Sequence, residues 1–144
     1  MDYAQLAEQF LRDGHANMRH SPQHRIDESM RGEGFVLFFL STHGDTVQPS
    51  DISNAMNVST ARIAAALNVL ENKGLITRSI DKGDRRRILV ALTPEGKRLA
   101  QQRQQNMLEL TTRMFELLGE DDALAFVRIM GKLRDIAPQM GLLE

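Results

Sequence analysis

Both ends of the chain carry apolar residues at every third or fourth position, which is the spacing of an amphipathic helix. The first such stretch spans residues 3–18, and two more are expected over residues 94–118 and 121–137. Their apolar stripes have no obvious partner in the middle of the chain, so we expect them to pack against a second copy. The stripe residues expected at this dimer interface are Leu6, Phe10, Met114, Leu117, Phe126, Met130 and Leu133.

The middle of the chain contains shorter elements. An all-apolar run at residues 35–40 follows a polar connector and is expected as a short helix or another buried segment in the core. A second short helix, over residues 49–56, begins with a proline and is followed by Asn57, which tolerates a left-handed turn. Ser59 can then cap a further helix, which Gly74 ends. The last two of these helices, joined by their tight turn, have the pattern of a helix-turn-helix unit.

Two strands are expected after this helix pair. Residues 75–80 and 87–92 read as strands, and residues 81–84 between them have the composition of a hairpin loop. The predicted fold class is mainly α with a small β-hairpin wing, in which a winged helix-turn-helix lobe is joined to a helical dimerisation lobe. We expect an N-terminal dimerisation helix and connector over residues 1–33, the winged lobe over residues 34–98 and the C-terminal dimerisation helices over residues 99–144.

The charge of the chain is uneven although its net value is only −1. Residues 73–103 contain nine lysines and arginines against three carboxylates, a local charge of +6, so the remainder carries −7. The cations on the expected hairpin are Lys82, Arg85, Arg86 and Arg87. A basic hairpin beside such a helix pair indicates a DNA-binding protein. One helix fits the major groove of DNA, while guanidinium groups on the hairpin can enter the minor groove.

Two motifs resemble those of the MarR family of bacterial regulators, which is named for multiple antibiotic resistance. They are the helix end LENKGLI at residues 70–76 and the wing sequence DRRRILVALTPEG at residues 84–96. The order and approximate lengths of the expected helices are also similar to the family, most closely over residues 49–99. The resemblance implies a homodimer with interleaved terminal helices, whose two winged lobes reach one palindromic operator in double-stranded DNA. It also implies a transcription regulator, which we expect to be a repressor.

The resemblance implies roles for individual residues. In such proteins the arginine two residues after the wing aspartate enters the minor groove and the aspartate orients it; here these are Arg86 and Asp84. The expected DNA-contacting positions at the start of the recognition helix are Ser59, Thr60, Ala61, Arg62 and Ala65. We expect Arg62 to meet a base edge. Ala65 stands where relatives frequently have a polar or basic contact residue, so the operator sequence does not follow from this helix.

An effector is a further implication of the resemblance, because the family commonly responds to small molecules. We expect a small apolar or amphipathic ligand between the dimer helices and each winged lobe, since pockets form at such junctions. Residues 31–34 are glycine-rich where many relatives are apolar, which leaves the geometry of this pocket open.

Other classes of function have little support in the residues. The chain has no cysteine, and it shows no arrangement of nucleophile, base and orienting group, so neither a cofactor nor an enzymatic activity is expected. We also expect no metal site, because the four histidines lack a ligand-like spacing; they are His15, His20, His24 and His43. The longest apolar run is too short to cross a membrane, and no leader opens the chain, so a cytoplasmic location is expected.

One alternative belongs to another class of function. A winged-helix dimer can become a protein-interaction or scaffold module that no longer reads DNA. Loss of the wing arginines would be its signature, and all three arginines at residues 85–87 are present. Salt-sensitive retention on a heparin or DNA column separates the two hypotheses, because a pure protein-binding module should not show it.

Overall fold

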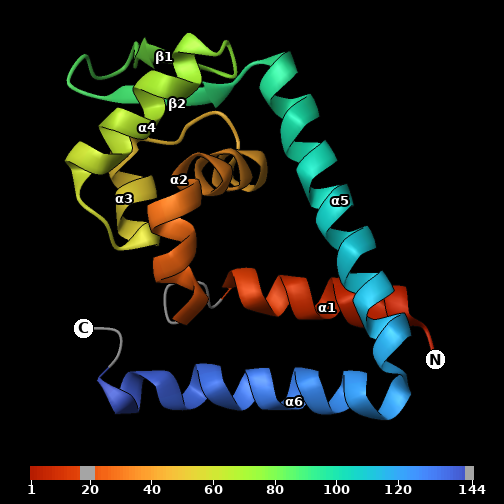
Figure 1. The fold of residues 1–144 in the computed structure, drawn as a ribbon. Helices are drawn as coiled ribbons and strands as arrows, with labels where there is room; N and C mark the ends of the chain where they lie inside the picture. Colours follow the sequence, from red (N-terminus) through yellow and green to blue (C-terminus); the bar gives the residue numbers. More distant parts are fainter. Residues whose placement is uncertain (17–21, 142–144) are drawn as a thin grey trace. The chain divides into compact units, whose positions relative to one another are not determined.

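The computed structural model describes residues 1–16 and 22–141, with side chains at residues 1–14 and 32–141. The described part is mainly helical with one antiparallel hairpin, which confirms the predicted fold class (Figure 1). In chain order its elements are α1 (Tyr3–Ala16), α2 (Pro22–His43), α3 (Pro49–Met56), α4 (Thr60–Asn72), β1 (Ile76–Ile80), β2 (Ile88–Leu92), α5 (Pro94–Leu118), α6 (Glu120–Ile136) and a 3-10 turn (Ala137–Met140). No described helix is both long enough and apolar enough to cross a membrane.

The chain forms two compact units. One consists of residues Asp27–Arg103, and we call it the winged unit. The other combines Met1–Ile26 with Gln104–Glu144, and we call it the terminal unit. Each unit is described by itself below.

The prediction of a polar connector before residue 35 is wrong, because residues 22–43 form one continuous helix, α2. A proline is well tolerated in the first turn of a helix, and most residues that follow it are compatible with one. Gly32 and Gly34 each lower the stability of the helix by about 1 kcal/mol relative to alanine. This cost is offset by burial of the apolar run that follows, whose buried members are Val36, Leu37, Phe39 and Leu40. The expected end of the first helix, Met18, lies outside the described residues.

The helix pair α3 and α4 follows the expected boundaries closely. Asn57 takes the left-handed conformation at φ 58°, and the Ser59 side chain accepts a hydrogen bond from the Arg62 backbone N–H at 3.2 Å. The two helices pack through a common core with α2, to which they contribute Ile52, Met56, Ile63, Leu67 and Leu70. This packing fixes the direction of α4 within the winged unit.

The hairpin pairs β1 with β2 in an antiparallel register from Ile76↔Leu92 to Ile80↔Ile88 (Figure 1). Val90 and Leu92 point into the core of the winged unit, whereas Ile88 on the same face is exposed because it lies beyond the core. The backbone N–H of Val90 also donates to the carbonyl of Val47 at 2.8 Å. The segment before α3 is thereby tied to the sheet.

The terminal unit has a small core of its own, made by α1, α6 and the second half of α5. The rings of Phe10, Phe115 and Phe126 lie 5.5–6.1 Å apart in tilted and edge-on arrangements, and Ala7 and Ala123 are buried beside them. Aromatic pairs of this geometry are stabilising beyond their buried area. Three of the stripe residues, Leu6, Phe10 and Phe126, therefore already have partners within one chain.

Candidate nucleic-acid interface

The start of α4 is an exposed, capped helix end. Ile63, Leu67 and Leu70 point into the core. The residues predicted to contact DNA on this helix and its cap are all exposed: Ser59, Thr60, Ala61, Arg62 and Ala65. The Ser59 hydroxyl oxygen is occupied as the cap, so the longest reach at this helix end is that of the Arg62 guanidinium.

The wing ends in a tight turn built on Asp84. The Arg87 backbone N–H donates to the Asp84 carbonyl at 3.0 Å, which closes the turn. The Asp84 carboxylate accepts from the Arg86 backbone N–H at 3.0 Å and from its Nε at 3.2 Å. The hydrogen bond from the Arg86 side chain is the main cause that lowers the pKa of Asp84 below its usual value. Asp84 therefore remains ionised and holds both the backbone and the side chain of Arg86.

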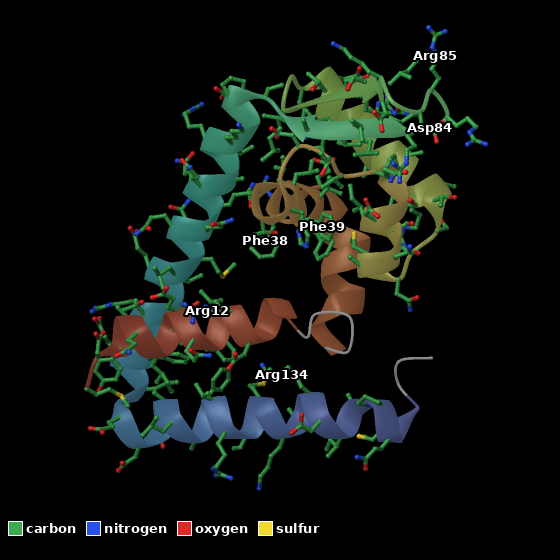
Figure 2. The ribbon with its side chains drawn as sticks, turned by 180° about the vertical axis from the view of Figure 1, so that it is seen from behind. Arg12, Phe38, Phe39, Asp84, Arg85 and Arg134 are labelled. Carbon is green, nitrogen blue, oxygen red and sulfur yellow. The ribbon has the colours of Figure 1, made fainter. Side chains whose placement is uncertain are left out.

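The wing arginines are directed to solvent despite these contacts. The Arg86 side chain is 92% exposed although its Nε is held by Asp84. Figure 2 shows Arg85 extending outward from the loop, next to Asp84. Arg87 lies 4.0 Å from the Asp81 carboxylate, and Lys82 is exposed in the same loop. The hairpin thus brings together the five wing residues predicted from the sequence, with four cations near two carboxylates.

Several cations of the basic stretch outside the wing are paired with carboxylates of their own unit. Lys73 Nζ lies 3.0 Å from Glu33 Oε2, and Arg98 pairs with Glu95 one helical turn away. The hydrogen bond from Arg98 is the largest cause that lowers the pKa of Glu95. These ion pairs therefore neutralise part of the positive charge counted along the sequence.

Arg78 makes a contact with Glu71 that the sequence did not reveal. Although it counts toward the basic stretch, its guanidinium forms a fork on Glu71, with Nε 3.2 Å from Oε2 and Nη2 3.0 Å from Oε1. Nη2 also donates to the Asn68 amide oxygen at 2.7 Å. The hydrogen bond from Arg78 is the largest cause that lowers the pKa of Glu71. This fork joins strand β1 to helix α4 and so connects the wing to the recognition helix.

His43 is the one histidine whose side chain the structure describes. Its ring stacks on Phe39 with centroids 3.8 Å apart, and its Nδ1 lies 2.9 Å from the Phe39 carbonyl oxygen. Phe39 itself lies on α2 (Figure 2). The described side chains contain no group of three residues suited to a metal ion. The side chains of His15, His20 and His24 lie outside the described residues, so the metal expectation for them stays a prediction.

Comparison with known proteins gives matches over the winged unit and beyond it. The sequence profile of the MarR family matches residues 31–87. The chain is 35% identical to the uncharacterised HTH-type transcriptional regulator YwhA of Bacillus subtilis over 101 residues, which are 69% of this chain and 71% of that protein. It is 31% identical to the HTH-type transcriptional repressor MdtR of Bacillus subtilis over 116 residues, 76% of this chain and 74% of the relative.

Two solved structures have a fold similar to that of this chain. The crystal structure of Streptococcus pneumoniae FabT in complex with DNA superposes with a TM-score of 0.68 at 21% identity, covering 76% of each chain. The YusO protein from Bacillus subtilis superposes with a TM-score of 0.62 at 26% identity, covering 91% of this chain and 92% of that one. The first likeness shows a shared fold.

Proposed function

Because this chain belongs to the MarR family of transcriptional regulators, we propose that it binds a palindromic operator in double-stranded DNA as a homodimer and represses transcription there. The observation that carries the proposal is the wing turn, where Asp84 holds Arg86 while leaving its side chain 92% exposed. A relative named as a repressor and a similarly folded chain crystallised with DNA support it. The regulator is not an enzyme.

The two reading elements suit the two grooves of DNA. The exposed N-terminal turn of α4 is narrow enough for the major groove, where base edges differ in their donors and acceptors. The wing carries Arg86 on a turn that is closed by backbone hydrogen bonds. A guanidinium on such a turn can enter the minor groove, whose negative potential is strongest where the groove is narrow. We therefore assign base reading to α4 and shape reading to the wing.

Homodimerisation is supported by the apolar surface of the terminal unit. Large apolar side chains remain exposed along the second half of α5, along α6 and in the 3-10 turn after it: Met107, Leu110, Met114, Leu117, Leu118, Leu124, Ile129, Leu133, Ile136 and Met140. Large apolar side chains left exposed in such number indicate an interaction site. Two identical subunits would bury it by pairing the same surface with itself. A two-fold dimer matches a palindromic site, which requires two recognition helices related by symmetry.

The first prediction concerns Arg86. Arg86→Ala should weaken binding to a selected operator and to a scrambled duplex by a similar factor, about tenfold, because minor-groove readout depends mainly on charge and groove width. It should also reduce the slope of log K against log salt by about one. The measurement is DNA affinity at four or five salt concentrations on both duplexes. Asp84→Ala should show the same pattern with a smaller loss, since the cation remains but loses its orienting partner.

Arg62→Ala is the matched control, because it removes the same charge from the other reading element. The substitution should weaken the binding free energy for the selected operator by about 1–3 kcal/mol and relax the preference mainly at one base position of each half-site.

Wild type must also be retained on a DNA column in a salt-sensitive way. A scaffold module that does not read DNA would bind neither duplex, and that result would refute the proposal. An unchanged slope and scrambled-site affinity in Arg86→Ala would show that the wing does not touch DNA.

We further propose that a small apolar or amphipathic molecule regulates this binding. The support is membership of the family, together with the general preference of small-molecule sites for apolar linings with a few polar groups. A ligand that binds the free protein more tightly than the DNA-bound protein should raise the thermal stability, because it binds the folded state and not the unfolded one. It should also lower operator affinity, by the ratio of its affinities for the free and the DNA-bound protein. Screening amphipathic aromatic compounds by thermal shift and by DNA titration tests this. Compounds that stabilise the protein while leaving DNA affinity unchanged would contradict it.

A further inference from the structure

Asn68 is an exposed polar residue in the middle of α4 that the sequence did not single out. It lies three and four residues after Ala65 and Ala64, so all three share the face of α4 opposite to the buried residues. Alanine side chains are too short to keep a neighbouring surface at a distance. On this face, Asn68 is therefore the first side chain after the cap region that carries both a hydrogen-bond donor and an acceptor.

The orientation of the Asn68 amide is fixed by Arg78. Arginine has five N–H donors and no acceptor, so the amide atom that faces Nη2 at 2.7 Å must be the oxygen. Arg78 is itself held by two further hydrogen bonds to Glu71, with only 29% of its side chain exposed. Charge-assisted fork contacts of this kind are strong and geometrically specific. The Asn68 oxygen is thus turned toward the wing, and its NH2 group is turned away from Arg78.

We propose that Asn68 is a specificity-determining residue that presents its NH2 group as a donor to a base edge in the major groove, with Arg78 as its positioning residue. The inference rests on the DNA-binding function proposed above. It deepens that function by naming the chemistry of one contact, which was not among the expected site residues.

The preferred base follows from the amide orientation. A free asparagine pairs with adenine through both its oxygen and its NH2 group, because adenine offers N7 as acceptor and N6 as donor. Here the oxygen is turned toward Arg78 and already accepts its hydrogen bond, which disfavours the orientation in which the oxygen and the NH2 group meet adenine N6 and N7 together. Guanine offers two adjacent acceptors, N7 and O6, which both suit a donor. Asn68 therefore selects guanine over adenine at one position of each half-site.

The test begins with selection of bound sequences from random DNA by wild type and by Asn68→Ala. Wild type should select guanine at one position in each half-site, and Asn68→Ala should lose the preference there and bind the selected site about tenfold more weakly. Replacing that guanine by 7-deazaguanine removes the N7 acceptor. This should weaken wild-type binding several-fold and leave the affinity of Asn68→Ala unchanged. Asn72→Ala is the matched control, an exposed asparagine at the end of the same helix that should keep the preference.

Arg78→Lys tests the positioning role, because lysine keeps the charge but cannot fork onto Glu71 and Asn68 together. The variant should retain the wild-type salt slope while its preference at the Asn68 position broadens from guanine to guanine or adenine. An equal loss of affinity on all sequences, tracking a loss of thermal stability, would mean that Arg78 is structural and would overturn the inference. So would an unchanged preference in Asn68→Ala, or adenine at the position it affects. If wild type selects no sequence at all, the proposed DNA-binding function itself is wrong. If wild type selects a sequence but Asn68→Ala keeps the same preference, only the inference about Asn68 is wrong.

Discussion

Gly96→Ala should destabilise the protein more than any other single-methyl change in the winged unit. A Cβ atom built at Gly96 would lie 2.0 Å from the Leu75 carbonyl oxygen, 3.0 Å from its carbon and 3.1 Å from Leu92 Cδ2. The same carbonyl oxygen accepts a hydrogen bond from the Thr93 backbone N–H at 3.0 Å. The first turn of α5 therefore sits directly on the backbone where β1 begins, and a glycine is needed for this approach.

The clash cannot be relieved cheaply because the atoms it meets belong to the backbone. Thr93 also donates from Oγ1 to the Gly74 carbonyl at 2.7 Å, so the helix start is tied to this segment twice. Moving α5 outward would break these bonds. Alanine gains about 1 kcal/mol in helix propensity over glycine, but a buried overpacking strain of about 2–4 kcal/mol outweighs it. Urea unfolding at fixed protein concentration should show the loss as a lower midpoint, or as failure to fold.

Gly32→Ala provides the control for this experiment. Gly32 is also helical and lies in the same unit, but nothing lies within 4 Å of a Cβ built there. The substitution should raise the free energy of unfolding by about 1 kcal/mol, since alanine is the better helix former. Equal unfolding midpoints for Gly96→Ala and wild type would show that α5 does not approach the Leu75 carbonyl as closely as the structure has it.

Much of the winged unit was predictable because local chemistry sets its boundaries. A left-handed Asn57, a serine cap at Ser59 and a left-handed Gly74 at φ 74° each act within a few residues. The same holds for the wing turn, where Asp84 bonds to Arg86 only two positions away. Local rules therefore placed both the recognition helix and the wing.

The features that sequence reasoning missed depend on contacts between distant residues. The polar composition of residues 22–33 and the glycine at 32 predict a connector, whereas these residues extend a helix anchored by the buried run after them. The charge count could not show the fork of Arg78 on Glu71, because this contact exists only once β1 lies against α4. The stripes of α1 and α6 have no obvious partner in the middle of the chain, but Phe10 and Phe126 contact each other and Phe115 within the terminal unit. Periodicity identifies an apolar face and does not say what covers it.

The second large effect is expected at the dimer surface, where Leu117→Asp should convert the protein to monomers. Leu117 is 73% exposed on α5 within one chain, so the substitution removes little packing from the subunit itself. In a two-fold dimer the same change occurs twice, once on each side of the interface. Burying two unpaired carboxylates should cost several kcal/mol, which corresponds to a dissociation constant weakened by at least about a hundredfold. Leu133→Asp on α6 should act in the same way.

Sedimentation equilibrium from nanomolar to micromolar concentration measures this shift, and circular dichroism shows whether each subunit keeps its helices. Gln102→Asp is the control, because it adds the same charge to α5 in its exposed polar half and should leave the dimer intact. Operator affinity should fall together with dimerisation in Leu117→Asp, since one winged unit can hold only one half-site of a palindrome. If Leu117→Asp sedimented as a dimer at micromolar concentration with full operator affinity, the apolar surface of the terminal unit would not be the interface between subunits.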